Sequence, residues 1–494
     1  MGKLREKIAK ADEKLQLNEE AFRPSGWVVA VVLIFLIAAM STSIFLFEQH
    51  LHITMLICMG FTILLLVLDG CSYSKIEKAM LHGGLLVIPT LLVLFCIGAL
   101  MGSWIASGTV PMIIYWGLKL INPAAFLATA CIACMITSLA TGSSWSTVGT
   151  VGVALMGVGL GLNINPAMTA GAVVSGAVFG DKMSPMSDTT NVAPAVAEAD
   201  IFDHIKAMMF TGGPAIVIAL IIYVIMGINH QGDVDSATID AITSALKTGF
   251  HLNAWTLVPI VVVFVLAIKK VPAFPTLLIS GLLAAVIALF AQGSGFVNIL
   301  SVMENGFVSE TGIAEIDKLL SRGGIFSMNY NVTLSVIVMV YGGLLEKCGI
   351  LAVFLDKIKG LTKTVGTLVL TTVITEIALN LLTASQYLTI VLGGRLLIPC
   401  YKEKDMLPQT LSRTLEDSGT VTSMLIPWNL CGAFATAALG VNSFVYLPYA
   451  FFNLLTPVIA ILWGFLGKFQ WKTGEIPSKR TYRDVQEDEK PAEA

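Results

Sequence analysis

Long apolar stretches recur along most of the chain, and short polar segments separate them. A helix of roughly 20 apolar residues spans about 30 Å, which is the thickness of the hydrocarbon core of a bilayer. The pattern therefore predicts membrane-spanning helices rather than the helices of a water-soluble core. The clearest stretches are 26–47, 51–69, 84–105, 209–228, 254–269, 273–291, 330–346 and 445–466.

Four further apolar regions are interrupted by polar or helix-breaking residues. They are 123–161 and 166–197 in the first half of the chain, and 364–400 and 410–437 in the second. Because the interruptions occur at comparable places in the two halves, they suggest an internal repeat.

The two halves also resemble each other in sequence. Thr141-Gly-Ser-Ser-Trp-Ser-Thr147 aligns with Thr383-Ala-Ser-Gln-Tyr-Leu-Thr389, 242 positions later. Asp181 then falls near Glu416 and Asp417. Several matches in one order at a nearly constant spacing predict a duplication.

The distribution of lysine and arginine predicts the orientation, because cytoplasmic loops carry more of these residues. They crowd segments 1–25 and 467–494 but are few in 229–253. Both termini are therefore expected in the cytoplasm, with five crossings in each half. This count requires 123–161 and 364–400 to be re-entrant hairpins, and an odd number of crossings inverts the second half relative to the first.

We therefore expect an all-α polytopic membrane protein built from two inverted-topology repeats of about five spanning segments each. The predicted parts are a cytoplasmic N-terminal segment (1–25), repeat 1 (26–228) with hairpin tip 141–147 and broken helix 166–197, an external linker (229–253), repeat 2 (254–466) with hairpin tip 383–389 and broken helix 410–437, and a cytoplasmic tail (467–494).

Composition supports a membrane protein and narrows its chemistry. Hydrophobic residues make up 55% of the 494 residues and charged residues only 13%, against about 25% charged residues in soluble domains. The net charge of −3 gives no reason to expect a nucleic-acid partner. A Walker A sequence is lacking, so ATP-driven transport is not predicted. The chain is also expected to have no cofactor and not to be an enzyme. The eight cysteines lie mostly in apolar runs and are expected to be packing residues.

One apolar region contains a dense polar run, Gly176-Ala-Val-Phe-Gly-Asp-Lys-Met-Ser-Pro-Met-Ser-Asp-Thr-Thr-Asn-Val-Ala-Pro194. Pro185 disfavours helical geometry at the preceding residue, so the helix should break at Ser184. A charged side chain at bilayer depth needs a partner, a ligand or a water-filled cavity. We predict an ion site here, with the candidate residues Asp181, Ser184, Asp188, Thr189 and Asn191.

The two predicted hairpin tips carry hydroxyl groups, which suit a hard cation such as Na⁺ by extension from the oxygen preference of Ca²⁺ and Mg²⁺. The alternative is that serine and threonine only allow close helix packing in lipid. The candidates are Thr141, Ser143, Ser144 and Thr147 in the first tip, and Thr383, Ser385 and Thr389 in the second. The predicted Na⁺ ligands are Asp181, Asp188, Ser144 and Thr147.

Each charged candidate also has a structural interpretation. Asp181 and Asp188 could form ion pairs with Lys182 or Lys206, and Asp188 could also cap a cytoplasmic helix end. The Gly176/Gly180 pair indicates close helix packing rather than a cofactor loop. His204 is expected to be solvated in a loop rather than to act as a pH sensor.

In the second half the predicted ion-binding residues are Glu416, Asp417 and Thr420, although Arg413 could simply neutralise one carboxylate. Glu376 and Asn380, one helical turn apart, are possible secondary sites. Arg395 could either neutralise a substrate carboxylate or reach the cytoplasmic surface.

The run from Gly176 to Pro194 resembles the signature of NhaC-family Na⁺/H⁺ antiporters, and Ser412-Arg-Thr-Leu-Glu-Asp-Ser-Gly-Thr420 with Pro427-Trp-Asn429 is similar to the same family. The resemblance covers about residues 26–466. It implies a scaffold domain and a moving transport domain in a homodimer, with ion sites at the hairpin tips and adjoining broken helices.

The predicted function is Na⁺/H⁺ antiport across a prokaryotic plasma membrane by elevator-like alternating access. A buried carboxyl group without a fixed cation can hold a proton near neutral pH and exchange it for Na⁺. One alternative is a Na⁺-coupled organic-acid exchanger of the malate–H⁺/Na⁺–lactate type. Alternatives from other classes are an intramembrane aspartyl protease with Asp181 and Asp417 as its dyad, and a channel or sensor.

Overall fold

The computed structural model describes residues 22–46, 51–120, 122–229, 236–269, 271–310, 317, 320–358 and 362–472. The predicted N-terminal segment and cytoplasmic tail lie almost wholly outside these residues, as does part of the predicted linker. The described chain is helical throughout, without a β-strand. The expectation of an all-α protein is therefore confirmed.

The helices of the first half follow the predicted stretches closely. They are α2 (Gly26–Phe45), α3 (Leu51–Leu68), α4 (Tyr73–Ala106), α5 (Thr109–Leu120), α6 (Phe126–Thr141), α7 (Ser144–Thr147), α8 (Val153–Gly161), α9 (Pro166–Met183), α10 (Asp188–Ala197) and α11 (Ile201–Ile228). A π-helical turn, η2 (Val148–Gly152), joins α7 to α8.

The second half has a similar succession. It contains α12 (Ser236–Gly249), α13 (Val258–Ile268), α14 (Ala273–Ala291), α15 (Phe296–Asn305), α17 (Asn329–Lys347), α18 (Ile350–Ile358), α19 (Val365–Thr383), α20 (Gln386–Glu403), α21 (Pro408–Leu415), the π-helix η6 (Glu416–Thr420), α22 (Val421–Ser423), α23 (Leu430–Leu439), α24 (Ser443–Tyr446) and α25 (Phe451–Leu466).

Within the described residues, nine helices are long and apolar enough to cross a membrane, or up to eleven if each of two bent pairs is one span. Large apolar side chains are also exposed on the outer surface, among them Leu68 (70%) and Phe290 (85%). A soluble monomer rarely shows contiguous apolar surface on this scale. The chain is therefore a polytopic membrane protein.

α4 differs from its prediction because it begins eleven residues before the apolar stretch 84–105. The Ser72 hydroxyl caps the helix by accepting a hydrogen bond from the backbone N–H of Lys75. This cap adds polar turns to an apolar helix, giving 34 residues in all. Hydropathy alone cannot detect such an extension.

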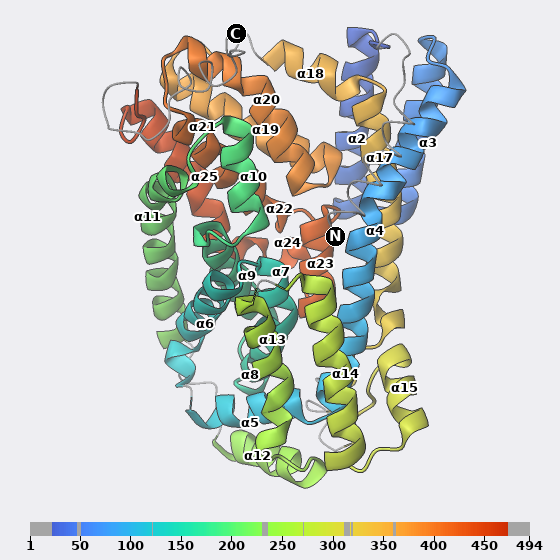
Figure 1. Cartoon of the computed structure of the whole chain (residues 1–494), viewed down its shortest axis with the longest axis vertical. Coiled ribbons are helices and arrows are strands. Elements are labelled where there is room, and N and C mark those ends of the chain that lie inside the picture. Colours follow the sequence, from blue (N-terminus) through green and yellow to red (C-terminus); the bar gives the residue numbers. More distant parts are fainter. Residues whose placement is uncertain are drawn as a thin grey trace, which may run out of the picture.

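Two helix pairs approach the middle of the molecule from opposite ends (Figure 1). α6 and α8 lie in the lower part of the view, toward α5 and α12, whereas α19 and α20 lie in the upper part, beside α18. Each pair reverses direction within two residues, Gly142-Ser143 in the first and Ala384-Ser385 in the second.

The first of the two residues adopts left-handed backbone geometry in both turns, with φ of 65° at Gly142 and 54° at Ala384. The second residue then caps the returning helix through its side chain: Ser143 accepts from the backbone N–H of Ser146, and Ser385 from that of Leu388. The two sharp turns thus have the same construction.

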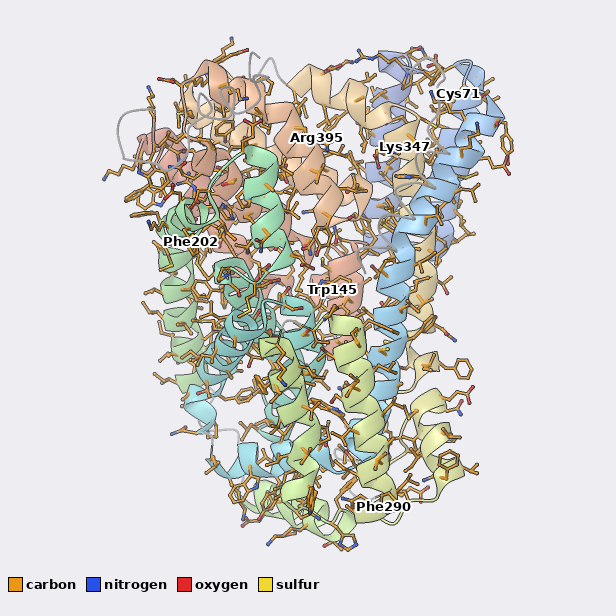
Figure 2. The ribbon with its side chains drawn as sticks, viewed as in Figure 1. Cys71, Trp145, Phe202, Phe290, Lys347 and Arg395 are labelled. Atoms are coloured by element: carbon orange, nitrogen blue, oxygen red, sulfur yellow. The ribbon has the colours of Figure 1, made fainter. Side chains whose placement is uncertain are left out.

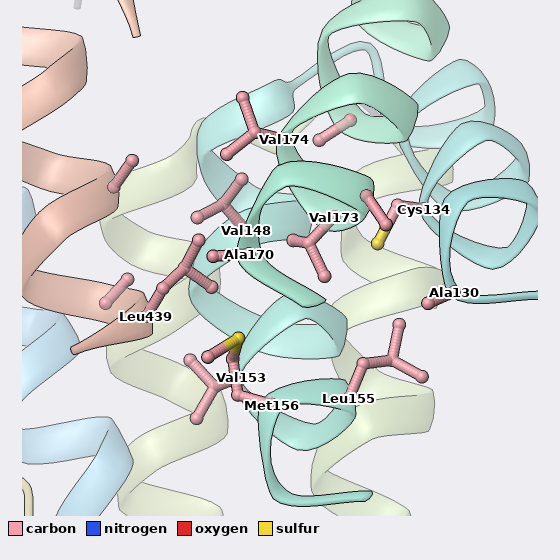
Figure 3. Packing of buried hydrophobic residues seen from close by; sticks show 14 of the residues in the cluster. Ala130, Cys134, Val148, Val153, Leu155, Met156, Ala170, Val173, Val174 and Leu439 are labelled. Atoms are coloured by element: carbon pink, nitrogen blue, oxygen red, sulfur yellow. The ribbon is translucent and has the colours of Figure 1, made fainter. Parts of the chain in front are cut away.

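The largest hydrophobic cluster surrounds α6, α8 and α9 and includes the stretch shown in Figure 3. α9 approaches α6 closely because glycines face it. A β-carbon at Gly176 would lie 2.1 Å from the Cys131 carbonyl oxygen, and one at Gly180 would lie 2.3 Å from that of Met135. The packing interpretation of this glycine pair is confirmed. All eight cysteines are buried, as expected for packing residues.

A second hydrophobic cluster joins α2, α3, α4, α17 and α18. α4 and α17 also pack directly on each other, where a β-carbon at Gly83 would lie 2.1 Å from the Met339 carbonyl oxygen. α6, α8 and α9, around the polar run, are thus held by one apolar core. A second core holds α2, α3 and α17 at the upper right of Figure 1.

Candidate functional site

The polar run forms a broken helix, as predicted. α9 ends at Met183, and Ser184 has extended geometry (φ −89°, ψ 124°) because Pro185 follows it. The chain restarts as α10 at Asp188, with Ser187 as its cap. The hydroxyl of Thr190 donates to the carbonyl groups of Asp181 (3.2 Å) and Lys182 (3.1 Å) at the C-terminal end of α9.

Asp181 lies at the end of α9 and is 6% exposed. The hydroxyl of Ser144, the first residue of α7, donates a 2.6 Å hydrogen bond to Asp181 Oδ2. The first tip and the first broken helix therefore meet at a carboxylate. Figure 2 shows the neighbouring Trp145 near mid-height in the molecule, where its ring stacks on Phe434.

Lys182, the next residue, does not neutralise Asp181. Its ammonium group forms a fully buried ion pair with Asp417 in the second half of the chain. Asp417 also accepts a 2.9 Å hydrogen bond from the Thr211 hydroxyl, and Arg413 Nε lies 3.7 Å from its other oxygen. Lys206 pairs with Asp203 at the surface instead. Both structural pairings suggested for Asp181 are therefore wrong.

The neutralisation of one carboxylate by Arg413 is confirmed for Asp417, although Lys182 is the closer partner. The guanidinium group is fully buried and also donates a 2.6 Å hydrogen bond to the Phe469 carbonyl oxygen. Asp417 is thus surrounded by fixed cations and a hydroxyl donor. An aspartyl dyad needs two carboxyl groups in contact and sharing a proton, and these contacts on Asp417 argue against it.

Two further carboxyl groups, those of Glu376 and Glu416, are fully buried in the second half. Among the described residues, the Glu376 oxygens have no hydrogen-bond partner, whereas the hydroxyls of Thr189 and Thr420 hydrogen-bond Glu416. Glu416 is close enough to Glu376, Asp181 and Lys182 for their charges to act on it.

The polar side chains of the second tip hydrogen-bond to one another and to Asn380. The hydroxyls of Thr383 and Thr389 lie 3.2 Å apart, and Thr389 donates to Asn380 Oδ1 at 3.3 Å. Asn380 Nδ2 in turn donates to the Gly419 carbonyl oxygen at 2.5 Å. Ser385 is used as the cap of α20. The two tips share backbone geometry, but the hydroxyl of the first contacts a carboxylate and those of the second contact neutral groups.

Some predicted ligands do not join Asp181. Asp188 and Asn191 are exposed on α10, where Asn191 Nδ2 donates to the carbonyl oxygens of Pro185 (3.0 Å) and Ser187 (2.6 Å). Asp188 lies within 3.5 Å of the Tyr387 hydroxyl. Only Asp181 and Ser144 of the predicted Na⁺ ligand set are in contact.

The other candidates are placed as follows. Ser184, Thr189, Thr147 and Thr420 are buried near the breaks, and Thr141 and Ser143 are half-buried at the first tip. The Thr147 hydroxyl lacks a partner among the described residues. Arg395 is exposed on α20, above Trp145 in Figure 2, and is separate from the buried cluster.

The structure also bears on the alignment of the halves near Asp181. Ser423 donates a 3.2 Å hydrogen bond to Gln386, and this pair is separated by 37 positions, as is the Ser144–Asp181 pair. Gln386 follows the second tip directly, as Ser144 follows the first. By spacing alone, Ser423 stands where Asp181 does, whereas the sequence comparison placed Asp181 near Glu416 and Asp417.

His204 is another correction. It is fully buried on α11, and its Nδ1 lies 2.8 Å from the Ser412 hydroxyl, so it is not a solvated loop residue. Sequence reasoning also missed Lys182 and Thr211 as partners of Asp417. A count of buried charges would have indicated an interhelical pair, because a lysine inside an apolar region needs an acidic partner.

The buried cluster contains more acids than bases. It has four carboxyl groups, on Asp181, Glu376, Glu416 and Asp417, and two permanent cations, Lys182 and Arg413. Both cations are committed to Asp417. The other carboxyl groups must hold protons or receive a mobile cation, because uncompensated buried charge is costly.

These features define a polytopic helical membrane protein with titratable groups at a broken helix in its interior. The chain belongs to the Na⁺/H⁺ antiporter family: a family model of that description matches residues 176–468. It is 37% identical to the Na⁺/H⁺ antiporter NhaC of Alkalihalophilus pseudofirmus over 446 residues, 90% of this chain and 96% of the relative.

Two relatives from Bacillus subtilis have similar coverage. A malate–2H⁺/Na⁺–lactate antiporter is 35% identical over 90% of this chain and 95% of its own length. The Na⁺/H⁺ antiporter NhaC is 36% identical over 88% of this chain and 96% of its own length. The resemblance noted at residues 176–194 is therefore confirmed as family membership.

Proposed function

We propose that the protein exchanges Na⁺ for protons by alternating access, and that Asp181 is the carboxyl group at which the two cations compete. The observation that carries this proposal is the isolation of Asp181. It is buried at a helix break, it accepts a bond from one hydroxyl, and the adjacent lysine is committed to Asp417. Membership of the antiporter family supports the same function.

The cycle follows from the cost of a bare buried charge. On the cytoplasmic side Na⁺ displaces the proton from Asp181, and the Ser144 hydroxyl oxygen supplies a second ligand once its own proton turns away. On the outer side a proton displaces Na⁺. A site holding either cation is neutral, whereas an empty carboxylate is too costly to carry through the membrane, so the two fluxes are coupled.

We further propose that the two sharp turns are tips of re-entrant hairpins in inverted repeats. The equal construction of the turns at Gly142 and Ala384 supports this, as does the opposite entry of the two helix pairs (Figure 1). The proposed setting is a homodimer in a prokaryotic plasma membrane, with both termini cytoplasmic, a fixed scaffold, and a transport domain that moves as an elevator. No cofactor is part of the proposal.

A second candidate is Na⁺-coupled exchange of organic acids such as malate and lactate. The relative of that name supports it, as does the exposed guanidinium group of Arg395 on α20. Tyr387, two helical turns before it, is 43% exposed beside Asp188. This candidate predicts that Arg395→Ala reduces transport only when a carboxylate is present.

The test uses proteoliposomes with a preset pH gradient and an internal pH dye. Na⁺, Li⁺ or K⁺ is added, each with and without lactate and malate, to wild-type and Asp181→Asn protein. Na⁺ alone should dissipate the gradient in wild-type liposomes and have no effect in the variant. Dissipation that requires a carboxylate would instead support the organic-acid exchanger, and a response in Asp181→Asn equal to wild type would refute the assigned site.

A further inference from the structure

Glu376 occupies an unusual position on α19. Its carboxyl group fills the space left by two glycines of other elements. A β-carbon at Gly393 of α20 would lie 1.7 Å from Glu376 Oε1, and one at Gly419 of η6 would lie 2.5 Å from Oε2. No other residue type could stand at either glycine without displacing the carboxyl group. The two glycines therefore leave the space that this carboxyl group occupies.

Glu416 lies three residues before Gly419 in the same π-helical segment. Its charge acts on the Glu376 carboxyl group. Both side chains are fully buried. In the part of the chain that the structure describes, the Glu376 oxygens have no hydrogen-bond partner, and the groups that hydrogen-bond Glu416 are the neutral hydroxyls of Thr189 and Thr420. π-helical turns are rare and frequently occur at functional sites.

Within the described ranges, the Glu376–Glu416 pair has no cation of its own. The charges of Lys182 and Asp181 on α9 act on Glu416. Lys182 and Arg413 of α21 are both paired with Asp417. The polar side chain facing the same element one turn along α19 is the neutral Asn380. Two adjacent carboxyl groups without a dedicated cation cannot both ionise and must share at least one proton.

We propose that Glu376 and Glu416 form a second exchange site, separate from Asp181, that binds and releases a proton during each transport cycle. A proton suits the Glu376 carboxyl group better than Na⁺, because the groups against it are glycines, which bring no side-chain oxygen, whereas hard cations are surrounded by oxygen ligands. The step is a proton transfer alone: the carboxyl O–H bond breaks and the proton passes to water on one side of the membrane.

The site is linked to Asp181 through charge. The charge of Asp181 acts on Glu416, so the two sites belong to one cluster, and a change of access that exposes Asp181 to one side of the membrane exposes the pair as well. The exchange would then move one proton more for each Na⁺ than Asp181 alone accounts for. This inference rests on the proposed Na⁺/H⁺ exchange and assigns its proton stoichiometry to named residues.

The test compares wild type with Glu376→Gln and Glu416→Gln in proteoliposomes. The first readout is the number of protons moved per Na⁺, obtained from the pH gradient that just balances a fixed Na⁺ gradient at clamped membrane potential. The second is exchange of radioactive ²²Na⁺ for unlabelled Na⁺ at equal pH, which needs no net proton movement. Glu403→Gln, on the exposed end of α20, is the matched control.

We expect both variants to move about one proton fewer per Na⁺ while ²²Na⁺ exchange stays within about twofold of wild type. Gly393→Ala, which keeps the carboxyl group but forces it away, should act in the same direction. An unchanged ratio would overturn the inference, and so would loss of ²²Na⁺ exchange, since the pair would then belong to the Na⁺ site. If one glutamine variant does not fold, the other decides.

Failure of the proposed function gives a different result. In that case wild type and Glu403→Gln would show no Na⁺-dependent proton movement at all, and the inference would fall with it. Normal coupling in both, together with an unchanged ratio in Glu376→Gln and Glu416→Gln, would overturn the second site alone.

Discussion

The Ser144 hydroxyl donates a 2.6 Å hydrogen bond to the Asp181 carboxylate, and this bond joins the first sharp turn to the first broken helix. Its counterpart in the second half, from Ser423 to Gln386, joins two neutral side chains at 3.2 Å. The two halves thus repeat a contact but not its charge, so the first half alone offers a carboxylate in this position.

This asymmetry predicts different effects of removing the two hydroxyls. Ser144→Ala should raise the apparent KM for Na⁺ by roughly 10-fold or more, because it removes the hydroxyl oxygen proposed as the second Na⁺ ligand, a contact comparable to a hydrogen bond with a charged group, about 1.5–3 kcal/mol. Ser423→Ala should leave the KM within about twofold of wild type. Na⁺-dependent proton movement in proteoliposomes measures both, and equal shifts would refute a special role for Ser144.

The ion pair between Lys182 and Asp417 connects the halves through a fully buried contact. Lys182→Met should lower the free energy of unfolding by about 3–5 kcal/mol, because it leaves a buried carboxylate with one partner fewer. Adding Asp417→Asn should restore part of the loss. Thermal unfolding in detergent measures both, with Lys206→Met at the surface pair as the control. Equal destabilisation by the double and single variants would contradict the pairing.

The left-handed backbone at the two tips predicts that alanine at Gly142 lowers stability whereas glycine at Ala384 does not. Gly142→Ala should destabilise the protein by about 1–2 kcal/mol through backbone strain alone, and its β-carbon would also meet the Met186 carbonyl carbon at 2.7 Å. Ala384→Gly should be close to neutral, because relief of strain offsets a lost methyl contact. Thermal unfolding of both variants is the measurement. A stable Gly142→Ala protein would show that the tip geometry is wrong.

The helices and their breaks were predictable from local sequence. Pro185 ends α9 through its effect on the preceding residue, and most apolar stretches became helices with shifts of a few residues, apart from the earlier starts of α4 and α11. The first tip was predictable because a glycine and a serine, Gly142 and Ser143, stand side by side there. At the second tip, Ala384 adopts a left-handed conformation that its residue type does not suggest, and only the repeat indicated it.

Contacts between distant residues were not predictable in the same way. Lys182 and Asp417 are 235 positions apart, and Glu376 lies beside two glycines of other helices. Such contacts depend on how the helices pack, which hydropathy does not encode.

The central claim is that Na⁺ and protons compete for Asp181. Equilibrium binding of ²²Na⁺ to purified protein tests it most directly, over a series of pH values and without any transport. We predict that the apparent Kd of wild type rises as pH falls, by up to about tenfold per pH unit, because protonation of the carboxylate removes the ligand. Asp181→Asn should bind no Na⁺ at any pH. Binding by Asp181→Asn with wild-type affinity, or a Kd independent of pH, would contradict the claim.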